Sequence, residues 1–175
     1  MSKVSKLGQL ANFVLYITLQ LVVTRFIVLF HTAFCFTYVA FLLLLPRRQE
    51  GEGLPLLLLI SFAVGLLIDM FYNSMGTHAF ASVLMVYSRA FLLKLMLPAG
   101  SYEVATQPTL SNLGWKRFSV FSLILIGIHH IALFFLDAGS IMLFFLVTHK
   151  VVFSTLLTYA VVLFIQSIVL LIRKR

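Results

Sequence analysis

Charged residues and cysteines are scarce in this sequence. Charged side chains make up 10% of its 175 residues, whereas soluble globular domains carry about 25%. The single cysteine, Cys35, excludes an intramolecular disulfide, so cysteine pairing does not indicate a compartment. The five acidic residues are scattered, and no Ser-His-Asp order, HExxH sequence or glycine-rich phosphate loop accompanies them. The sequence therefore predicts a protein that is not an enzyme and has no cofactor.

Apolar residues are abundant instead. They make up 62% of the chain, and the mean hydropathy is +1.10. A net charge of +8 would suggest a nucleic-acid partner in a soluble protein. Here the basic residues stand at the ends of apolar runs, as they do in membrane proteins. No cleavable signal peptide is expected, because the first apolar run lacks a small-residue cleavage site. We expect an all-α integral membrane protein that contacts lipid and no nucleic acid.

Apolar runs of membrane-spanning length indicate about six spans. A helix needs ~20 mostly apolar residues to cross a hydrocarbon core of ~30 Å. Only the charge of Arg25 marks a turn between the first two runs, near Thr24–Arg25. Five spans is therefore the alternative count. The predicted spans form one polytopic domain over residues 1–175 and cover about 8–24, 27–45, 54–73, 77–97, 117–136 and 141–171.

The basic residues also predict the orientation of the chain. With the N-terminus inside, ten of the thirteen Lys and Arg residues lie on the cytoplasmic side. Cytoplasmic loops carry an excess of Lys and Arg, so we expect both termini in the cytoplasm, which favours six spans over five. The ten residues are Lys3, Lys6, Arg47, Arg48, Lys94, Lys116, Arg117, Arg173, Lys174 and Arg175.

A polar face runs along the third predicted span. Ser61, Gly65, Asp69 and Asn73 recur every four residues, which places them on one side of a helix. Small residues allow a neighbouring helix to approach closely, and polar ones need partners away from lipid. Gly76 follows the apolar run and fits a helix terminus. We expect Asp69 to be a structural cap or ion-pair residue that holds the third and fourth spans together. A substrate or proton site and a partner contact are the alternatives.

The histidines of the spans are predicted to be buried and hydrogen-bonded. No two of them lie four residues apart on one helix, so a metal site is not expected. His129 and His130 are adjacent and therefore point about 100° apart on a helix. Thr77, which precedes His78, is a candidate N-cap for the fourth span.

The last span carries a second polar face, formed by Lys150, Ser154 and Thr158. Residues 141–171 would be ~46 Å long as a helix, which exceeds the hydrocarbon core. We expect the first turns to stand outside the core, with Lys150 near the outer interface and its ammonium reaching the headgroups. This face is a candidate contact for a partner helix. Arg89 is expected to lie nearer the cytoplasmic side and to extend to the headgroups or pair inside the bundle.

The stretch "LPLLLLISFAVGLLIDMFYNSMGTHAFASVLMVYSRAFLLKLMLP" (54–98) resembles the rod-shape-determining protein family MreD, in the form found in Bacteroidetes. The preceding "FLLLLPR" (41–47) is similar to the end of the family's second span. The total length and the basic C-terminus agree as well. The resemblance rests on a Gly-Leu-Leu-x-Asp-x-Phe core and the residues that follow it, namely Gly65, Leu66, Leu67, Asp69, Phe71, Gly76, His78 and Ala79.

This resemblance implies a non-catalytic subunit of the cell-elongation machinery in the bacterial inner membrane. MreD-like proteins associate with MreC, a single-span protein with a periplasmic domain. Through MreC they connect to a RodA-type glycosyltransferase, its class B transpeptidase partner and MreB filaments. The family's fold resembles the substrate-binding S-components of energy-coupling-factor vitamin transporters, so a small-molecule uptake subunit is the alternative. A concave outer pocket with several convergent polar groups would favour uptake.

Overall fold

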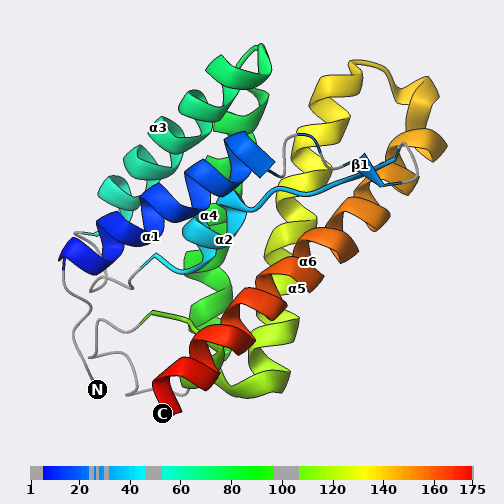
Figure 1. Ribbon diagram of the computed structural model, residues 1–175. Coiled ribbons are helices and arrows are strands. Elements are labelled where there is room, and N and C mark those ends of the chain that lie inside the picture. The colour runs from blue at the N-terminus through cyan, green and yellow to red at the C-terminus, as the bar shows by residue number, and fades with distance from the viewer. Residues whose placement is uncertain are drawn as a thin grey trace.

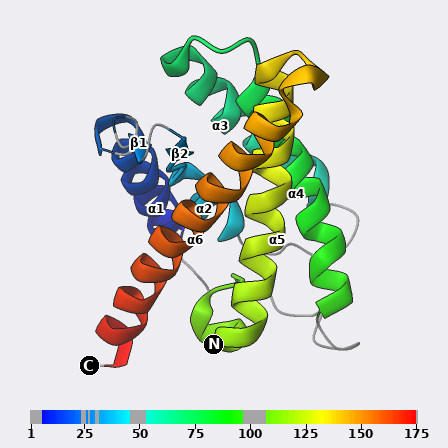
Figure 2. The same cartoon turned by 90° about the vertical axis from the view of Figure 1, so that its right-hand side faces the viewer.

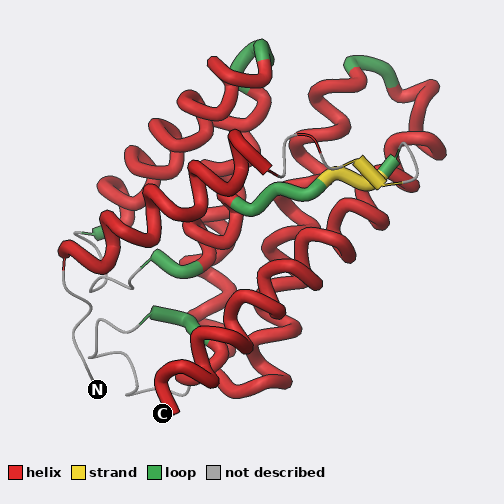
Figure 3. The backbone as a smooth tube through the Cα atoms, in the orientation of Figure 1, coloured by secondary structure: helices red, strands yellow, loops and turns green. Residues whose placement is uncertain are grey.

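The computed structural model describes residues 6–23, 26, 28–29, 32–45, 53–96 and 107–174. This part of the chain is mostly helical (Figures 1 and 3). Two short strands, β1 (Val28–Leu29) and β2 (Ala33–Phe34), pair in antiparallel fashion. The helices are α1 (Lys6–Thr18), its π-helical continuation η1 (Leu19–Val23), α2 (Tyr38–Leu43), α3 (Leu54–Tyr72), α4 (Thr77–Met96), α5 (Leu110–Ala138), the 3₁₀ turn η4 (Ile141–Leu143) and α6 (Phe144–Lys174).

Four helices in the described part of the chain are long and apolar enough to cross a membrane. They are α3, α4, α5 and the Phe144–Ile172 part of α6, and they coincide with the last four predicted spans. In chain order each packs against the next. The α3–α4 and α5–α6 connections lie at one end of the molecule, and the C-terminal end of α6 lies at the other (Figures 1 and 2). We refer to the end with the two connections as the hairpin end.

Local sequence explains where α3 and α5 begin. Pro55 stands in the first turn of α3, where its missing N–H costs no helical hydrogen bond. Thr109 caps α5, because its hydroxyl accepts the N–H of Asn112 at 3.3 Å. The helix then kinks at Gly114, whose φ of 73° is costly for a residue with a Cβ. The part of α5 before Gly114 is a short helical segment that precedes the predicted span 117–136.

The continuous helix predicted for 27–45 does not form. β1 and β2 occupy its first part, residues 35–37 belong to neither helix nor strand, and only α2 is helical. An apolar run shows that a segment avoids water, but it does not fix the backbone conformation. Non-helical backbone is tolerated at membrane depth where protein, rather than lipid, surrounds it, and Tyr38, Val39 and Leu42 are completely buried. The predicted turn at Thr24–Arg25 lies outside the described residues.

The segment 33–45 forms the centre of the core. α2 contacts α1, α4 and α5, and its six residues are all buried. Large apolar side chains such as Phe91, Phe145 and Leu171 are exposed on the outer faces of α4 and α6. Lipid tails or a partner's apolar helix suit such a surface, since neither offers hydrogen bonds.

Candidate functional site

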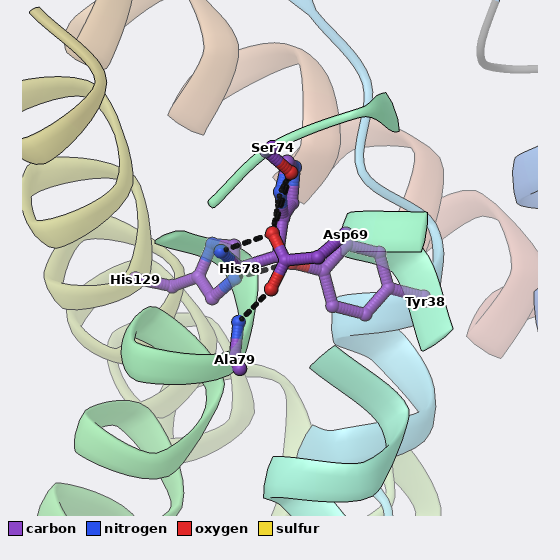
Figure 4. A network of polar contacts seen from close by, with 6 residues as sticks. All are labelled: Tyr38, Asp69, Ser74, His78, Ala79 and His129. Carbon is purple, nitrogen blue, oxygen red and sulfur yellow. Dashed lines mark hydrogen bonds and ion pairs between the residues drawn. The ribbon is translucent and has the colours of Figure 1, made fainter. Parts of the chain in front are cut away.

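Asp69, near the end of α3, caps the beginning of α4. Its buried carboxylate accepts the backbone N–H of His78 at 3.0 Å and that of Ala79 at 2.9 Å (Figure 4). The first N–H groups of a helix have no partner within it, and a negative charge there interacts favourably with the helix dipole. Thr77, the predicted cap, does not serve, because its hydroxyl has no hydrogen-bond partner among the described residues. Asp69 thus joins the two helices, at the place where the sequence predicts a junction.

The turn between α3 and α4 folds around this carboxylate. Asn73 ends α3 in a left-handed conformation with φ of 55°. The Ser74 hydroxyl donates to Asp69 Oδ1 at 2.5 Å. Gly76, with φ of 83°, accepts the N–H of Phe80 at 3.0 Å and is the last residue before α4. Asn73 is exposed and so does not continue the buried polar face, because α3 ends one residue before it.

His78 completes this network at the first turn of α4. Its ring Nδ1 lies 3.1 Å from Asp69 Oδ1 and 3.0 Å from Ser74 Oγ. Oδ1 therefore accepts from the Ser74 hydroxyl and from both the ring and the backbone of His78. Nε2 of the buried ring has no hydrogen-bond partner in the described part of the chain. Such a buried polar atom costs free energy unless something binds it.

Gly65 brings α3 and α4 into backbone contact. A Cβ at this position would lie 2.4 Å from Ala79 Cα and 2.6 Å from the His78 carbonyl oxygen. Ser61, one turn earlier, is completely buried, and its hydroxyl donates to the Leu58 carbonyl at 2.8 Å. Of the predicted polar face, Ser61, Gly65 and Asp69 are buried. Gly65 and Asp69 contact α4 of the same chain directly and leave no room for a partner's helix there.

Phe36 lies in the middle of a cluster of buried aromatic and histidine rings. Its ring centroid is 5.6 Å from that of His78, 6.3 Å from His129 and 5.4 Å from His130. His129 Nε2 lies 2.6 Å from the Tyr38 hydroxyl. Both adjacent histidines are buried because α5 is covered on different sides by α4 and α6. In the described part of the chain, no group of three or more His, Cys, Asp or Glu side chains is placed to hold a metal ion.

The polar face of α6 holds the non-helical segment 33–37. Ser154 Oγ accepts the backbone N–H of Phe34 at 3.0 Å, and Thr158 Oγ1 accepts that of Phe36 at 3.1 Å. Both hydroxyl residues are completely buried. Lys150, one turn earlier, places Nζ 6.0 Å from the Phe34 ring centroid. The sequence predicts Ser154 and Thr158 as contacts for a partner helix. In the structure they face inward and accept hydrogen bonds from backbone groups of their own chain.

Two further polar side chains support the same core from other helices. Gln20 of η1 donates to the Tyr72 hydroxyl at 2.6 Å and accepts from the Thr37 hydroxyl at 3.1 Å. Arg89 of α4 is buried and donates from Nε to the Leu43 carbonyl at 3.2 Å. It also donates to the Leu45 carbonyl, so it binds carbonyl groups at the end of α2, where a positive charge is favourable. Of the two predicted roles of Arg89, pairing inside the bundle is the one observed.

Sequence reasoning missed Gln20, Tyr38 and Ser74. Gln20 has a usable signal, since it is an amide within a long apolar run, and such residues face the bundle interior. Ser74 lies in a short turn, where a hydroxyl is common, and nothing local connects it to Asp69. Tyr38 reaches His129 across 91 positions of sequence, and no local pattern reveals that contact.

The geometry defines a class of protein: a mostly helical chain with four helices of membrane-spanning length and apolar composition, joined by a buried polar network. A scan against protein-family models, a search of curated proteins and a search of solved structures each found no match. The function proposed next therefore rests on the residues and their arrangement.

Proposed function

We propose that this chain is a non-catalytic subunit of the bacterial cell-elongation machinery, as its resemblance to MreD implies. It binds an MreC-like single-span protein through helix contacts in the inner membrane. Through that partner it connects to a RodA-type glycosyltransferase, a class B transpeptidase and MreB. Both termini lie in the cytoplasm, and the hairpin end faces the periplasm.

The residues that carry the resemblance support this proposal by what they contact. Gly65 allows α4 to approach α3, Asp69 caps α4, and Gly76 ends the turn between them. Each is engaged in joining two helices of its own chain, a structural role that fits a non-catalytic subunit. A chain built in this way acts on its surroundings through its lateral surface.

An apolar groove on that surface is the observation that carries the proposal. The groove has a volume of about 390 Å³ and is bounded by α1, α2 and α3. Helices associate in lipid by close van der Waals packing, which small residues such as Ala63 allow. A single apolar helix from a partner suits this groove better than a polar solute does. The groove is lined by Leu10, Phe13, Phe41, Ile60, Ala63, Val64 and Leu67.

The cavity at the hairpin end bears on the alternative, a small-molecule (vitamin) uptake subunit. Its lining includes the polar side chains Ser74, His78, Asp137 and Lys150, which is what an uptake subunit requires. That cavity measures about 220 Å³, whereas pockets for drug-sized ligands measure about 300–1,000 Å³. Its volume suits a smaller molecule than most vitamins.

Photo-crosslinking in cells tests the proposed role. A photoreactive amino acid at Leu10, Ala63 or Leu67 places the reactive group in the groove, and we expect adducts with an MreC-like protein. Matched positions outside the groove are Phe91 and Leu95, which are exposed on α4, and these should give no such adduct. Failure at all three groove positions, or equal adducts at all five positions, would contradict the proposal. Tight binding of a vitamin by the purified protein would favour the uptake reading.

A further inference from the structure

A second cavity lies at the hairpin end, between the non-helical segment 33–37 and the four long helices. Its volume is about 220 Å³. An apolar cavity of about 150 Å³ is already large enough to bind benzene, so this one has room for a small organic solute. Ser74 of the α3–α4 turn and Asp137 in the last turn of α5 both contribute to its lining. The two connections lie at the same end of the molecule (Figures 1 and 2), and Asp137 is exposed there, so the cavity lies near the surface at this end.

The cavity contains two opposite charges. Lys150 of α6 and Asp137 of α5 both line it. The ion pair within 4.0 Å found among the described residues joins His78 to Asp69, so Lys150 and Asp137 are not paired with each other. The lining of the cavity therefore includes both a lysine and an aspartate that are free of each other. This pair of charges is complementary to a molecule that carries both an anionic and a cationic group.

His78 is a third polar residue of the lining. His78 lines the cavity, its side chain is 6% exposed, and its Nδ1 is engaged by Asp69 and Ser74. A neutral imidazole that donates from Nδ1 keeps Nε2 as an acceptor. In the described part of the chain this Nε2 is buried and has no partner, so the hydrogen bonds to a bound molecule are assigned to Lys150 and Asp137.

The remaining walls of the cavity are apolar and largely aromatic. Phe34, Phe36, Phe134, Tyr72 and Leu133 contribute them. Phe36 and Phe134 lie with ring centroids 6.1 Å apart. Aromatic faces accept both aliphatic groups and a cation. An apolar substituent on the bound molecule therefore has a place beside the charged groups.

We propose that this cavity binds a small free zwitterion of the amino-acid type. Lys150 binds its carboxylate, Asp137 accepts hydrogen bonds from its ammonium group, and the phenylalanine rings hold its side chain. The site does not depend on the proposed role in cell elongation, and it lies apart from the groove assigned to the partner helix.

Binding to the purified protein in a non-ionic detergent tests this site. Each of the common L-amino acids is titrated in turn, with calorimetry and thermal unfolding as the two readouts. We expect saturable binding of at least one of them. For the tightest, the corresponding amine without the carboxylate and the corresponding acid without the amine should each bind at least ~10-fold more weakly, a loss of ~1.4 kcal/mol. Phosphatidylethanolamine, added in nanodiscs, tests a lipid headgroup as the source of the same two charges.

Two variants connect the binding to the named charges. Lys150→Met should weaken the amino acid at least ~10-fold and leave the affinity for the amine unchanged. Asp137→Asn should weaken the amino acid and leave the affinity for the acid unchanged. Lys116→Met, at an exposed lysine of α5, is the matched control and should bind like the parent. The proposal is overturned if no amino acid binds, if the single-charge analogues bind equally well, if both variants bind like the parent, or if only the lipid binds.

Discussion

The Asp69 carboxylate supplies the hydrogen-bond acceptors that the N–H groups in the first turn of α4 lack. Helix N-termini are usually capped by the residue just before the helix. Here that residue is Gly76, which has no side chain, and the carboxylate comes from the preceding helix instead. The bonds fix how far α3 and α4 are apart and where α4 begins. The same bonds place the ring of His78, because His78 is one of the two residues whose N–H groups are bound. The ring of Phe36 packs against that of His78.

Replacing Asp69 by Ala should destabilise the protein. The N–H groups of His78 and Ala79 lose their acceptor, and an unsatisfied buried group costs ~1–3 kcal/mol. We expect thermal unfolding in detergent to show a loss of at least ~2 kcal/mol. Asp137→Asn, at an exposed carboxylate, is the control and should change stability by less than ~0.5 kcal/mol. If the Asp69 variant is as stable as the parent and loses only a binding activity, the structural role is wrong.

Replacing Gly65 by Ala should disrupt the α3–α4 contact. The added methyl group overlaps the backbone of Ala79 and His78, which cannot move aside as a flexible side chain can. Overpacking of this kind costs ~1–3 kcal/mol, and we expect a lower folded yield and a lower melting temperature. Gly127→Ala in α5 is the matched control, because nothing lies within 4 Å of its added Cβ. Equal stability of the two variants would show that the helices are not in close contact at Gly65.

At the scale of elements, α6 is long and apolar enough to cross a membrane, and it also supports the core. Ser154 and Thr158 of α6 accept hydrogen bonds from N–H groups two residues apart in the segment 33–37. A neighbouring β-strand would accept the same N–H groups. Extended backbone exposes N–H groups every second residue on one side, and a helix repeats a face about every four. One helical turn along α6 therefore matches one two-residue step of the extended chain. This match allows a non-helical segment to remain in an apolar core.

Thr158→Val should loosen this segment without changing the volume of the core. The N–H of Phe36 loses its acceptor, so we expect a loss of ~1–3 kcal/mol in unfolding free energy. Hydrogen exchange at the Phe36 amide should become faster. Thr148→Val on the same helix is the control, because its hydroxyl donates to the carbonyl of Phe144 in the previous turn of the same helix. Unchanged exchange at Phe36 would show that Thr158 does not hold the segment.

At the scale of the whole molecule, the hairpin end and the opposite end differ in charge. The last turn of α4 contains Lys94, and α5 begins near Lys116 and Arg117. The C-terminal end of α4 and the beginning of α5 lie toward the end where α6 terminates (Figures 1 and 2). Lys and Arg concentrate on the cytoplasmic side of membrane proteins. The fold therefore groups several of the charges on which the predicted orientation rests.

Reporter fusions test this orientation. A fluorescent protein that folds only in the cytoplasm should fluoresce when fused after Arg175, and alkaline phosphatase should be inactive there. Fusions after Gly139, at the hairpin end, should give the opposite pattern, because α6 crosses the membrane once between the two sites. Active phosphatase at Arg175 would show that the basic end faces the periplasm.

Particular residues show how far the sequence predicts the site. The four-residue spacing of Ser61, Gly65 and Asp69 places them on one face, and Gly76 marks a helix end, because helix geometry is local. The identity of the helix they meet is not encoded in that spacing. Ser154 and Thr158 show the same limit. Their common face is visible in the sequence, but whether it meets lipid, a partner or its own chain depends on residues more than 100 positions away.

The sequence by itself determined that the chain contains long apolar helices suited to lipid, since apolar runs of sufficient length must satisfy their backbone internally in lipid. Only the tertiary structure decided the conformation of 33–37. This part of the predicted second span is apolar, but the hydroxyls of α6 and the amide of Gln20 bind backbone groups of Phe34, Cys35 and Phe36, so it has no need to be helical. Tertiary structure also decided that Asp69 meets the beginning of α4, and that Asp137, Lys150 and His78 line one cavity. Contacts between distant residues require the packing of helices, which local spacing does not specify.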